Sequence, residues 1–231
     1  MTETIRLNLP DRVTRRSPTR RLLRRFSRSV NISLGASVLL FMIALAVLAP
    51  IITPYNPEQV TASLRLRPPD AEYLLGTDDF GRDVFTRIAY GARLSLLVGV
   101  ISVTLAATIG VTLGIVAGFY GGWIDALIMR LIDVMLAFPG ILLALVIVAI
   151  LGRSLTNVMI AVGISSIPVY ARMARGTTLA LKSIDYITAA RAVGAPTPRI
   201  MRLHIFPNIL APLIVVATNG VAGAIIAGAA L

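Results

Sequence analysis

The chain has 231 residues, of which 56% are hydrophobic and 14% are charged, and its mean hydropathy is +0.83. Soluble domains carry about 25% charged and about 45–50% apolar residues. This excess of apolar surface excludes an ordinary soluble domain and predicts a protein embedded in lipid. The absence of cysteine excludes disulfides and thiolate metal sites.

The formal net charge of +11 raises the question of nucleic-acid binding, but the positions of the basic residues favour membrane flanks. Nine of the 22 Lys and Arg residues lie in residues 1–30, and six more lie in 172–206, and both groups adjoin long apolar runs. Positive charge of this kind marks cytoplasmic flanks. Anionic lipid headgroups explain the arginines of the N-terminal tail more simply than nucleic acid does.

Residues 1–30 are predicted to form a basic, mostly disordered cytoplasmic tail. They do not read as a cleavable signal peptide, because the apolar stretch that follows is too long and lacks a small-residue cleavage site. That stretch, 31–53, spans roughly 34 Å as a helix, which is enough to cross a bilayer core. The segment 54–92 contains six acids and four arginines and is predicted to be an external loop.

The remaining apolar runs predict four more spans, so the fold class is an all-α, polytopic transmembrane helical bundle. Counted from the N-terminus, the third span (134–152) is expected to kink near Pro139, and the fourth (155–170) to be interrupted by Pro168. A cytoplasmic loop at 172–206 separates the last two spans. The apolar end at Leu231 lacks a charged flank, which predicts a truncated chain. The four spans are 94–120, 134–152, 155–170 and 209–231.

Small residues recur every four positions along the second span. Such a stripe lets another helix backbone approach closely, so it predicts tight helix packing, with a neighbour from this chain or from a partner subunit. The residues are Ser102, Ala106, Gly110, Gly114 and Gly118.

An acidic cluster and a lone histidine outside the spans raise the question of a metal or catalytic site. Asp78, Asp79 and Asp83 beside Arg82 are interpreted as a solvated, self-paired turn and not as a metal or catalytic site. His204 has no partners for metal ligation.

Arg130 and Asp133 are spaced to pair within one helix. They are interpreted as a structural pair at the membrane interface, with a role in a translocation pathway as the alternative.

The loop 172–206 contains the most informative segment. Ser183 is predicted to cap a helix of about ten residues, which Gly194 closes. Thr197 and Pro198 predict a second helix start immediately afterwards. A helix roughly 15 Å long cannot cross a membrane, so it is interpreted as an exposed element on which a soluble partner docks.

This loop resembles the EAA loop of the permeases of ATP-binding-cassette (ABC) importers. The resemblance rests on Thr188-Ala189-Ala190, on Gly194, and on the run His204-Ile205-Phe206-Pro207-Asn208. In that family the loop forms a coupling helix that sits in a cleft of the ATPase subunit. Thr188 stands where the family usually has glutamate. The residues expected to couple to the ATPase are Ile184, Asp185, Tyr186, Thr188, Ala189, Ala190, Gly194 and Ala195.

A second resemblance is to the C-type membrane subunit of dipeptide, oligopeptide and nickel importers. It rests on the run from Leu75 to Phe85, LGTDDFGRDVF, and on the run from Tyr90 to Leu96, YGARLSL. The resemblance implies a type I ABC importer permease in the bacterial inner membrane that moves peptides or similar small solutes by alternating access. Such subunits usually carry one further span.

The resemblance also implies the partners: a homologous second permease subunit, two ABC ATPase subunits or domains, and an extracytoplasmic substrate-binding protein. ATP and Mg²⁺ would bind in the ATPase partners, and this chain would hold no cofactor or metal and catalyse no reaction. A phosphate-binding loop is excluded because Leu181 replaces the glycine before Lys182, the only lysine in the chain.

Two function classes compete with this interpretation. A secondary transporter or channel needs no ATPase and predicts broken or charged helices in matching halves. A membrane-anchored scaffold needs neither the glycine stripe nor a docking loop. The identity of the solute does not follow from the sequence.

Overall fold

The computed structural model describes residues 30–231, so the predicted tail 1–30 lies almost wholly outside it. The described part is built of helices, with one isolated bridge between Thr77 and Asp83. Four helices are long and apolar enough to cross a membrane, and one bent helix pair would make a fifth span. The chain is therefore an all-α, multi-pass membrane protein.

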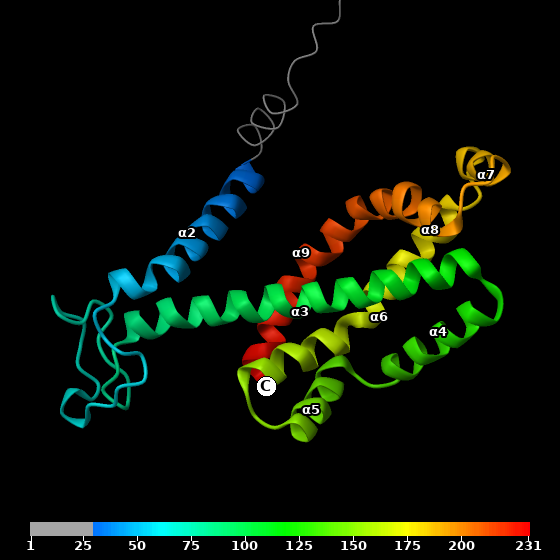
Figure 1. The fold of residues 1–231 in the computed structure, drawn as a ribbon. Coiled ribbons are helices and arrows are strands. Elements are labelled where there is room, and N and C mark those ends of the chain that lie inside the picture. Colours follow the sequence, from blue (N-terminus) through cyan, green and yellow to red (C-terminus); the bar gives the residue numbers. More distant parts are fainter. Residues whose placement is uncertain (1–29) are drawn as a thin grey trace, which may run out of the picture.

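The helices follow one another with few long connections. Figure 1 shows α2 and α3 diverging from a compact segment at one end of the molecule, while α7 lies at the other end. The elements are α2 (Val30–Ile52), a short 3₁₀ turn (Ala62–Leu64), α3 (Val84–Tyr120), α4 (Gly122–Leu136), α5 (Gly140–Leu151), α6 (Leu155–Leu181), α7 (Asp185–Ala192), α8 (Thr197–Ile200), a π-helical turn (Met201–Ile205) and α9 (Phe206–Ala230).

Helix α3 begins ten residues before the expected span because Asp83 caps it. The Asp83 carboxylate accepts a hydrogen bond of 2.8 Å from the Thr86 amide, which satisfies one of the free donors at the helix start. At the other end, Gly121 has φ +69° and its amide donates to the carbonyl of Ala117. This turn sends the chain directly into α4.

The parallel pair α3 and α6 forms the centre of the bundle, and the small-residue stripe lies on the contact. A Cβ added at Gly114 would overlap the carbonyl oxygen of Ala171 and would lie 2.9 Å from the amide nitrogen of Arg175. Gly110 and Gly118 lie similarly close to the α6 backbone. The neighbour of the stripe is therefore a helix of this same chain.

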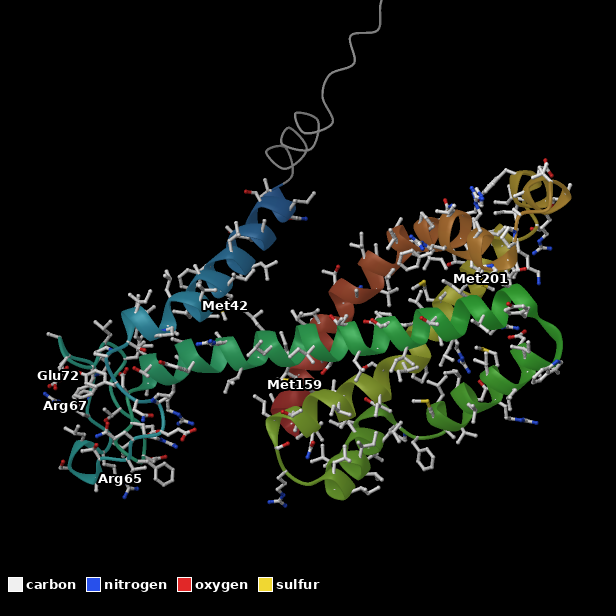
Figure 2. The ribbon with its side chains drawn as sticks, viewed as in Figure 1. Met42, Arg65, Arg67, Glu72, Met159 and Met201 are labelled. Atoms are coloured by element: carbon white, nitrogen blue, oxygen red, sulfur yellow. The ribbon has the colours of Figure 1, made fainter. Side chains whose placement is uncertain are left out.

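The same register continues along the whole contact. Ser102 Oγ donates a hydrogen bond of 2.8 Å to the carbonyl of Met159. Met159 lies near the beginning of α6 (Figure 2). Helix α9 packs across both helices in the opposite direction, with Gly220 against the hydroxyl of Tyr170 and Gly228 against Val98. A single apolar core thus joins α3, α6 and α9.

The prediction that Pro168 interrupts the fourth span is wrong. Helix α6 runs without a break from Leu155 to Leu181, and Pro168 is fully buried within it. Proline removes one helical hydrogen bond, but helices that pack tightly in a membrane tolerate it because neighbours hold the backbone in place. Here the neighbour is the glycine face of α3.

The third apolar run is a broken pair of helices. Helices α4 and α5 are bent by 88° at residues 137–139. Helix α4 starts at Gly122, twelve residues before the expected core, and α5 packs through Ala144 and Val148 against Ala161 of α6.

The predicted caps around α7 are also wrong in detail. Ser183 does not cap the helix, because its hydroxyl donates to the carbonyl of Ala180 at the end of α6. In α8, Pro196 occupies the cap position and Thr197 is the first helical residue, so the expected start is shifted by one residue. Both segments are helical, but neither begins with a side-chain cap.

The substitution Gly114→Ala tests the α3–α6 packing. The added methyl group meets backbone atoms that cannot move aside, so the variant should lose about 2 kcal/mol of stability. Thermal unfolding of the purified protein in detergent measures the loss.

Gly91→Ala is the matched control, since Gly91 lies in the same helix with nothing within 4 Å of an added Cβ. It should be neutral or slightly stabilising, because alanine favours the helix. Equal melting temperatures for the two variants would contradict the close contact.

Candidate functional site

Helix α7 is attached to the bundle along one side only. Ile187 is fully buried, while Ala190 and Ala195 are partly buried against the core. The opposite side is open, and it includes Thr188 and Ala189 as well as apolar groups. Ile184 and Tyr186 are exposed by 41% and 42%, and Val193 by 84%. A short helix with apolar groups facing outward is suited to fill a cleft in another protein.

The end of α7 is shaped by Gly194. Its φ is +79°, a conformation that favours glycine, and its amide donates to the carbonyl of Arg191 at 2.9 Å. The amide of Ala195 donates to the carbonyl of Ala190 at 3.0 Å. Together these bonds form the motif that closes many helices at their C-terminus. Asp185 lies in the first turn, where a negative charge is favourable.

Three contacts tie α7 to the helices beneath it. The guanidinium group of Arg191 lies 4.7 Å from the ring centroid of Phe119, near the end of α3. The rings of Tyr186 and His204 pack edge to face at 5.9 Å. Asn208, in the first turn of α9, donates a hydrogen bond of 3.4 Å to the hydroxyl of Tyr186. Helix α7 is therefore joined to both α3 and α9.

Lys182 makes a further link between α6 and α3. Its ammonium group donates to the carbonyls of Gly118 and Phe119, at 3.1 and 3.4 Å. These carbonyls lie in the last turn of α3, where the helix dipole favours a positive charge. The residue that leads out of α6 toward α7 thus also holds the end of α3.

The strongest ion pair in this region joins α6 to α4. Arg175 donates from Nε and Nη2 to the two carboxylate oxygens of Asp125, each at 2.6 Å. Both side chains are partly buried, at 34% and 17% exposure, and the two-point geometry fixes their relative orientation. The pair therefore connects α6 directly to α4.

Arg130 and Asp133 do not pair with one another. Asp133 accepts a hydrogen bond of 2.6 Å from Arg172 of α6, and no ion pair of Arg130 occurs within residues 30–231. The tertiary partner is favoured because α4 turns Asp133 toward α6. Spacing along a single helix could not reveal it, since the two residues are 39 positions apart.

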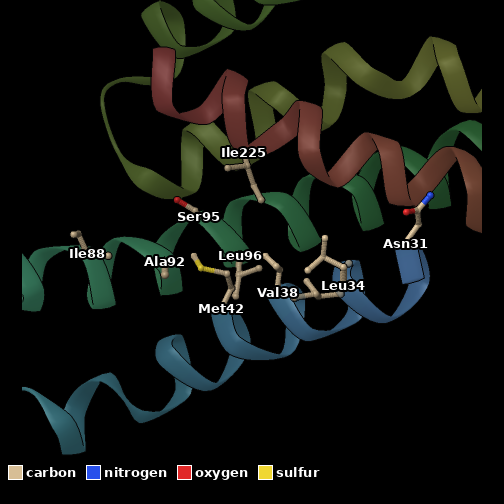
Figure 3. Close-up of a pocket in the computed structure, with 11 residues that line it drawn as sticks. Asn31, Leu34, Val38, Met42, Ile88, Ala92, Ser95, Leu96 and Ile225 are labelled. Atoms are coloured by element: carbon tan, nitrogen blue, oxygen red, sulfur yellow. The ribbon is translucent and has the colours of Figure 1, made fainter. Parts of the chain in front are cut away.

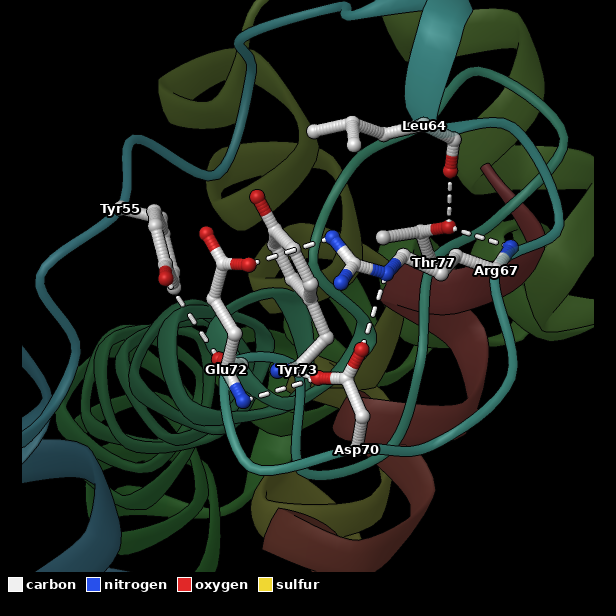
Figure 4. A network of polar contacts seen from close by, with 7 residues as sticks. All are labelled: Tyr55, Leu64, Arg67, Asp70, Glu72, Tyr73 and Thr77. Atoms are coloured by element: carbon white, nitrogen blue, oxygen red, sulfur yellow. Dashed lines mark hydrogen bonds and ion pairs between the residues drawn. The ribbon is translucent and has the colours of Figure 1, made fainter.

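At the opposite end of the molecule, residues 53–83 fold into a compact polar segment. Arg67 pairs with Asp70 at 2.9 Å and Glu72 at 3.1 Å, and the rings of Tyr55 and Tyr73 stack at 5.1 Å (Figure 4). The amide of Tyr73, together with Arg67, lowers the pKa of Asp70 below its ordinary value although burial opposes this.

The expected self-paired turn is present for Asp78, whereas Asp83 is buried and caps α3. Asp78 pairs with Arg82 at 2.8 Å and also with Arg87. Burial alone would raise the pKa of Asp78, but the amides of Arg82 and Phe80 and the two guanidinium groups outweigh it and hold the pKa well below its ordinary value. Residues 30–231 contain no cluster of three His, Cys, Asp or Glu side chains suited to a metal.

A groove of about 810 Å³ lies between α2 and α3 (Figure 3). Six residues of α2, four of α3 and Ile225 of α9 line it, and Asn31 and Ser95 supply its polar side chains. Such a lining suits apolar groups and offers little to a charged solute.

Comparison with known proteins gives the family. The profile described as "Binding-protein-dependent transport system inner membrane component" matches residues 110–231. A second profile, "N-terminal TM domain of oligopeptide transport permease C", matches residues 17–69. This chain belongs to the binding-protein-dependent permease family of ABC importers. It is a membrane permease of the peptide-permease C type, and the family serves transport rather than catalysis.

Several relatives are similar over most of their length. The dipeptide transport system permease protein DppC of Alkalihalophilus pseudofirmus is 48% identical over 96% of this chain and 73% of that protein. The di/tripeptide transport system permease protein DppC of Pseudomonas aeruginosa is 42% identical over 93% and 73%. The glutathione transport system permease protein GsiD of Escherichia coli is 42% identical over 96% and 73%.

Sequence reasoning missed the contacts that join α6 to α3 and to α4 near the permease's short helix. It treats Lys182 only as a candidate phosphate ligand, and it gives Asp125 no partner. The partners of both residues lie 50 or more positions away. One signal in the sequence could have indicated these pairings. Lys182 and Asp125 each lie beside an apolar span, where an unpaired charge is costly, so each is expected to have a partner.

Replacement of Arg175 tests the link between α6 and α4. Arg175→Met leaves the partly buried carboxylate of Asp125 without its partner, so the permease should lose about 2 kcal/mol of stability. Thermal unfolding in detergent measures the effect.

Arg130→Met is the matched control, because it removes the same charge from a residue of α4 that makes no ion pair within residues 30–231, and it should change the melting temperature little. A loss as large for Arg130→Met as for Arg175→Met would contradict the assigned pair.

Proposed function

We propose that this chain forms one half of the membrane passage of an ABC importer for short peptides or similar small solutes. Family membership supports the transport role, and the names of the relatives, which include dipeptide, di/tripeptide and glutathione permeases, support the solute class. The other half of the passage is a homologous permease subunit.

Helix α7 is the element that docks in the ATPase. The observation that carries this proposal is its one-sided attachment: Ile187 is buried, while Ile184, Tyr186 and Val193 remain exposed. Thr188, Ala189 and Ala190 lie within the docked helix, and Gly194 and Ala195 end it. ATP and Mg²⁺ bind in the ATPase partners, and this chain contributes no cofactor site.

The charge distribution supports an orientation in the inner membrane. The basic N-terminal tail and α7 lie on the cytoplasmic side, and residues 53–83 lie on the external side. The folded external segment is then available to the substrate-binding protein, and the ATPases approach from the α7 end. Arg130 is placed at the cytoplasmic interface, as is the Asp133–Arg172 pair.

The contacts around α7 supply a mechanism for alternating access. Movement of α7 reaches α6 through the three residues 182–184, α3 through Lys182 and Arg191, and α4 through the Arg175–Asp125 pair. The helices at this end therefore move as one body when the ATPases close or separate. Solute passes between the two permease subunits as that body rocks.

Val193→Glu tests the docking role of α7. It places a charge on an exposed apolar position without disturbing the buried side, so the permease should fold while its binding to the ATPases falls by roughly tenfold or more. Co-purification of ATPase subunits with the permease, and ATP-driven uptake in proteoliposomes, measure the effect.

Val60→Glu is the matched control, since Val60 is also exposed, by 61%, but lies in the 53–83 segment. It should retain the ATPases. If Val193→Glu retained them equally well, the docking role of α7 would be contradicted. Uptake that ran on an ion gradient with ATP depleted would contradict the ATP-driven mechanism.

A further inference from the structure

Helix α4 presents a stripe of large apolar side chains to the outside of the bundle. Trp123 is 75% exposed, and Leu127, Leu131 and Val134 are each more than half exposed. Their spacing of four, four and three residues places them on one side of the helix. The opposite side packs on the core through Ile132, which is fully buried. The described part of the chain therefore covers one side of α4 and leaves the other side open.

Arg130 belongs to the same stripe. It lies three residues after Leu127 and four before Val134, so it projects from the same side of the helix. Its side chain is exposed and makes no ion pair with any residue in 30–231. The two acids of α4, Asp125 and Asp133, are both paired with arginines of α6. The open face of α4 thus combines a single cation with apolar groups and has no acid of its own to balance it.

The position of Asp133 indicates the level at which Arg130 lies. Asp133 is the last charged residue before the run 134–152, which carries no charge. Arg130 lies three residues before Asp133, roughly 5 Å along the helix and away from the apolar run. The headgroup layer on each side of the hydrocarbon core is roughly 5–8 Å thick. The guanidinium group of Arg130 therefore lies at the level of the headgroups, which the proposed orientation makes those of the cytoplasmic leaflet.

A phospholipid suits this face better than water or a protein does. Water would leave a tryptophan and three aliphatic side chains hydrated, at a cost that grows with their apolar area. A protein that covered the stripe would bury Arg130, which is costly unless that protein supplies an acid at the same point. A phospholipid supplies both parts in one molecule, since its phosphate accepts hydrogen bonds from the guanidinium group and its acyl chains cover the aliphatic side chains.

We propose that the exposed stripe of α4 binds an anionic phospholipid, with the phosphate on Arg130 and the acyl chains along Leu131 and Val134. The planar guanidinium group can donate two parallel hydrogen bonds to phosphate oxygens. The net negative charge of the headgroup should add about fivefold to the binding relative to a zwitterionic lipid. Trp123 lies at the outer end of the stripe, and tryptophan is typical of the membrane–water interface.

This inference rests on the proposed orientation of the permease and names a lipid partner for it. Ile132 and the Asp125–Arg175 pair hold the inner side of α4 on the bundle. The lipid holds the outer side at the level of the headgroups. The stripe lies on α4 and not on α7, so the lipid site and the docking of the ATPase are separable by experiment.

The fluorescence of Trp123 tests the proposal, because it is the only tryptophan of the chain and lies seven residues from Arg130. The transporter complex is reconstituted into vesicles of phosphatidylglycerol and phosphatidylcholine in fixed proportion, with brominated acyl chains on one lipid or on the other. Bromine quenches tryptophan only at short range, and the signal of Trp123 is the difference from a Trp123→Phe complex. Phosphatidylglycerol should be preferred over phosphatidylcholine by about fivefold.

Arg130→Met should abolish this preference, because it removes the partner of the phosphate. In detergent without lipid the site is empty, so the same variant keeps its melting temperature there. Arg153→Met is the matched control, since Arg153 is also exposed but lies between α5 and α6, and it should keep the preference. If Arg130→Met does not assemble, Leu127→Glu replaces it. That carboxylate lies one turn from Arg130, competes with the phosphate and should also abolish the preference.

Three results would overturn the proposal. Equal quenching by the two lipids in the unmodified complex would contradict an anionic site, and quenching by neither would mean that a protein covers the stripe. A preference that survives in the Arg130 variant, or in the Leu127 variant that replaces it, would contradict the role of Arg130.

ATP-driven uptake by the same vesicles separates this proposal from the importer mechanism. A preference for phosphatidylglycerol without ATP-driven uptake would contradict the importer mechanism and keep the lipid site. ATP-driven uptake by a complex that shows no preference would keep the importer and overturn the lipid site.

Discussion

The close parallel contact between α3 and α6 determines the rest of the structure. In lipid there is little hydrophobic gain in bringing two apolar helices together, so association depends on close packing and on a few polar contacts. Gly110, Gly114 and Gly118 let the α6 backbone approach so closely that even a methyl group has no room. The Ser102 hydrogen bond fixes the register of this contact at one end.

That register also determines where the functional end of the chain lies. Because α3 and α6 run in parallel and in step, the end of α3 lies beside Lys182, which caps it, and Arg175 lies opposite Asp125. Helix α7 follows immediately and rests on Phe119 through Arg191. The exposed helix α7, proposed above as the docking element, is thus attached to the most closely packed part of the bundle.

Much of this could be predicted from the sequence, because hydropathy and small-residue spacing act locally. The long apolar runs, the glycine stripe, and a short helix ended by Gly194 all follow from such rules. The errors have a common cause, which is that tertiary contacts override local signals. Burial against α3 lets α6 continue through Pro168 without a break. Asp133 pairs with Arg172 of α6 and not with Arg130 of its own helix. The Lys182 and Arg175 contacts depend on the fold and have no signature in spacing.

The polar groups of the spans are satisfied in different ways at different depths. At the cytoplasmic edge, as proposed, charges pair between helices, as in Asp125–Arg175. Along α3, threonine hydroxyls donate hydrogen bonds to backbone carbonyls of their own helix. The hydroxyl of Tyr170 lacks a partner, but it is sealed in the core against Gly220, where no solvent reaches it.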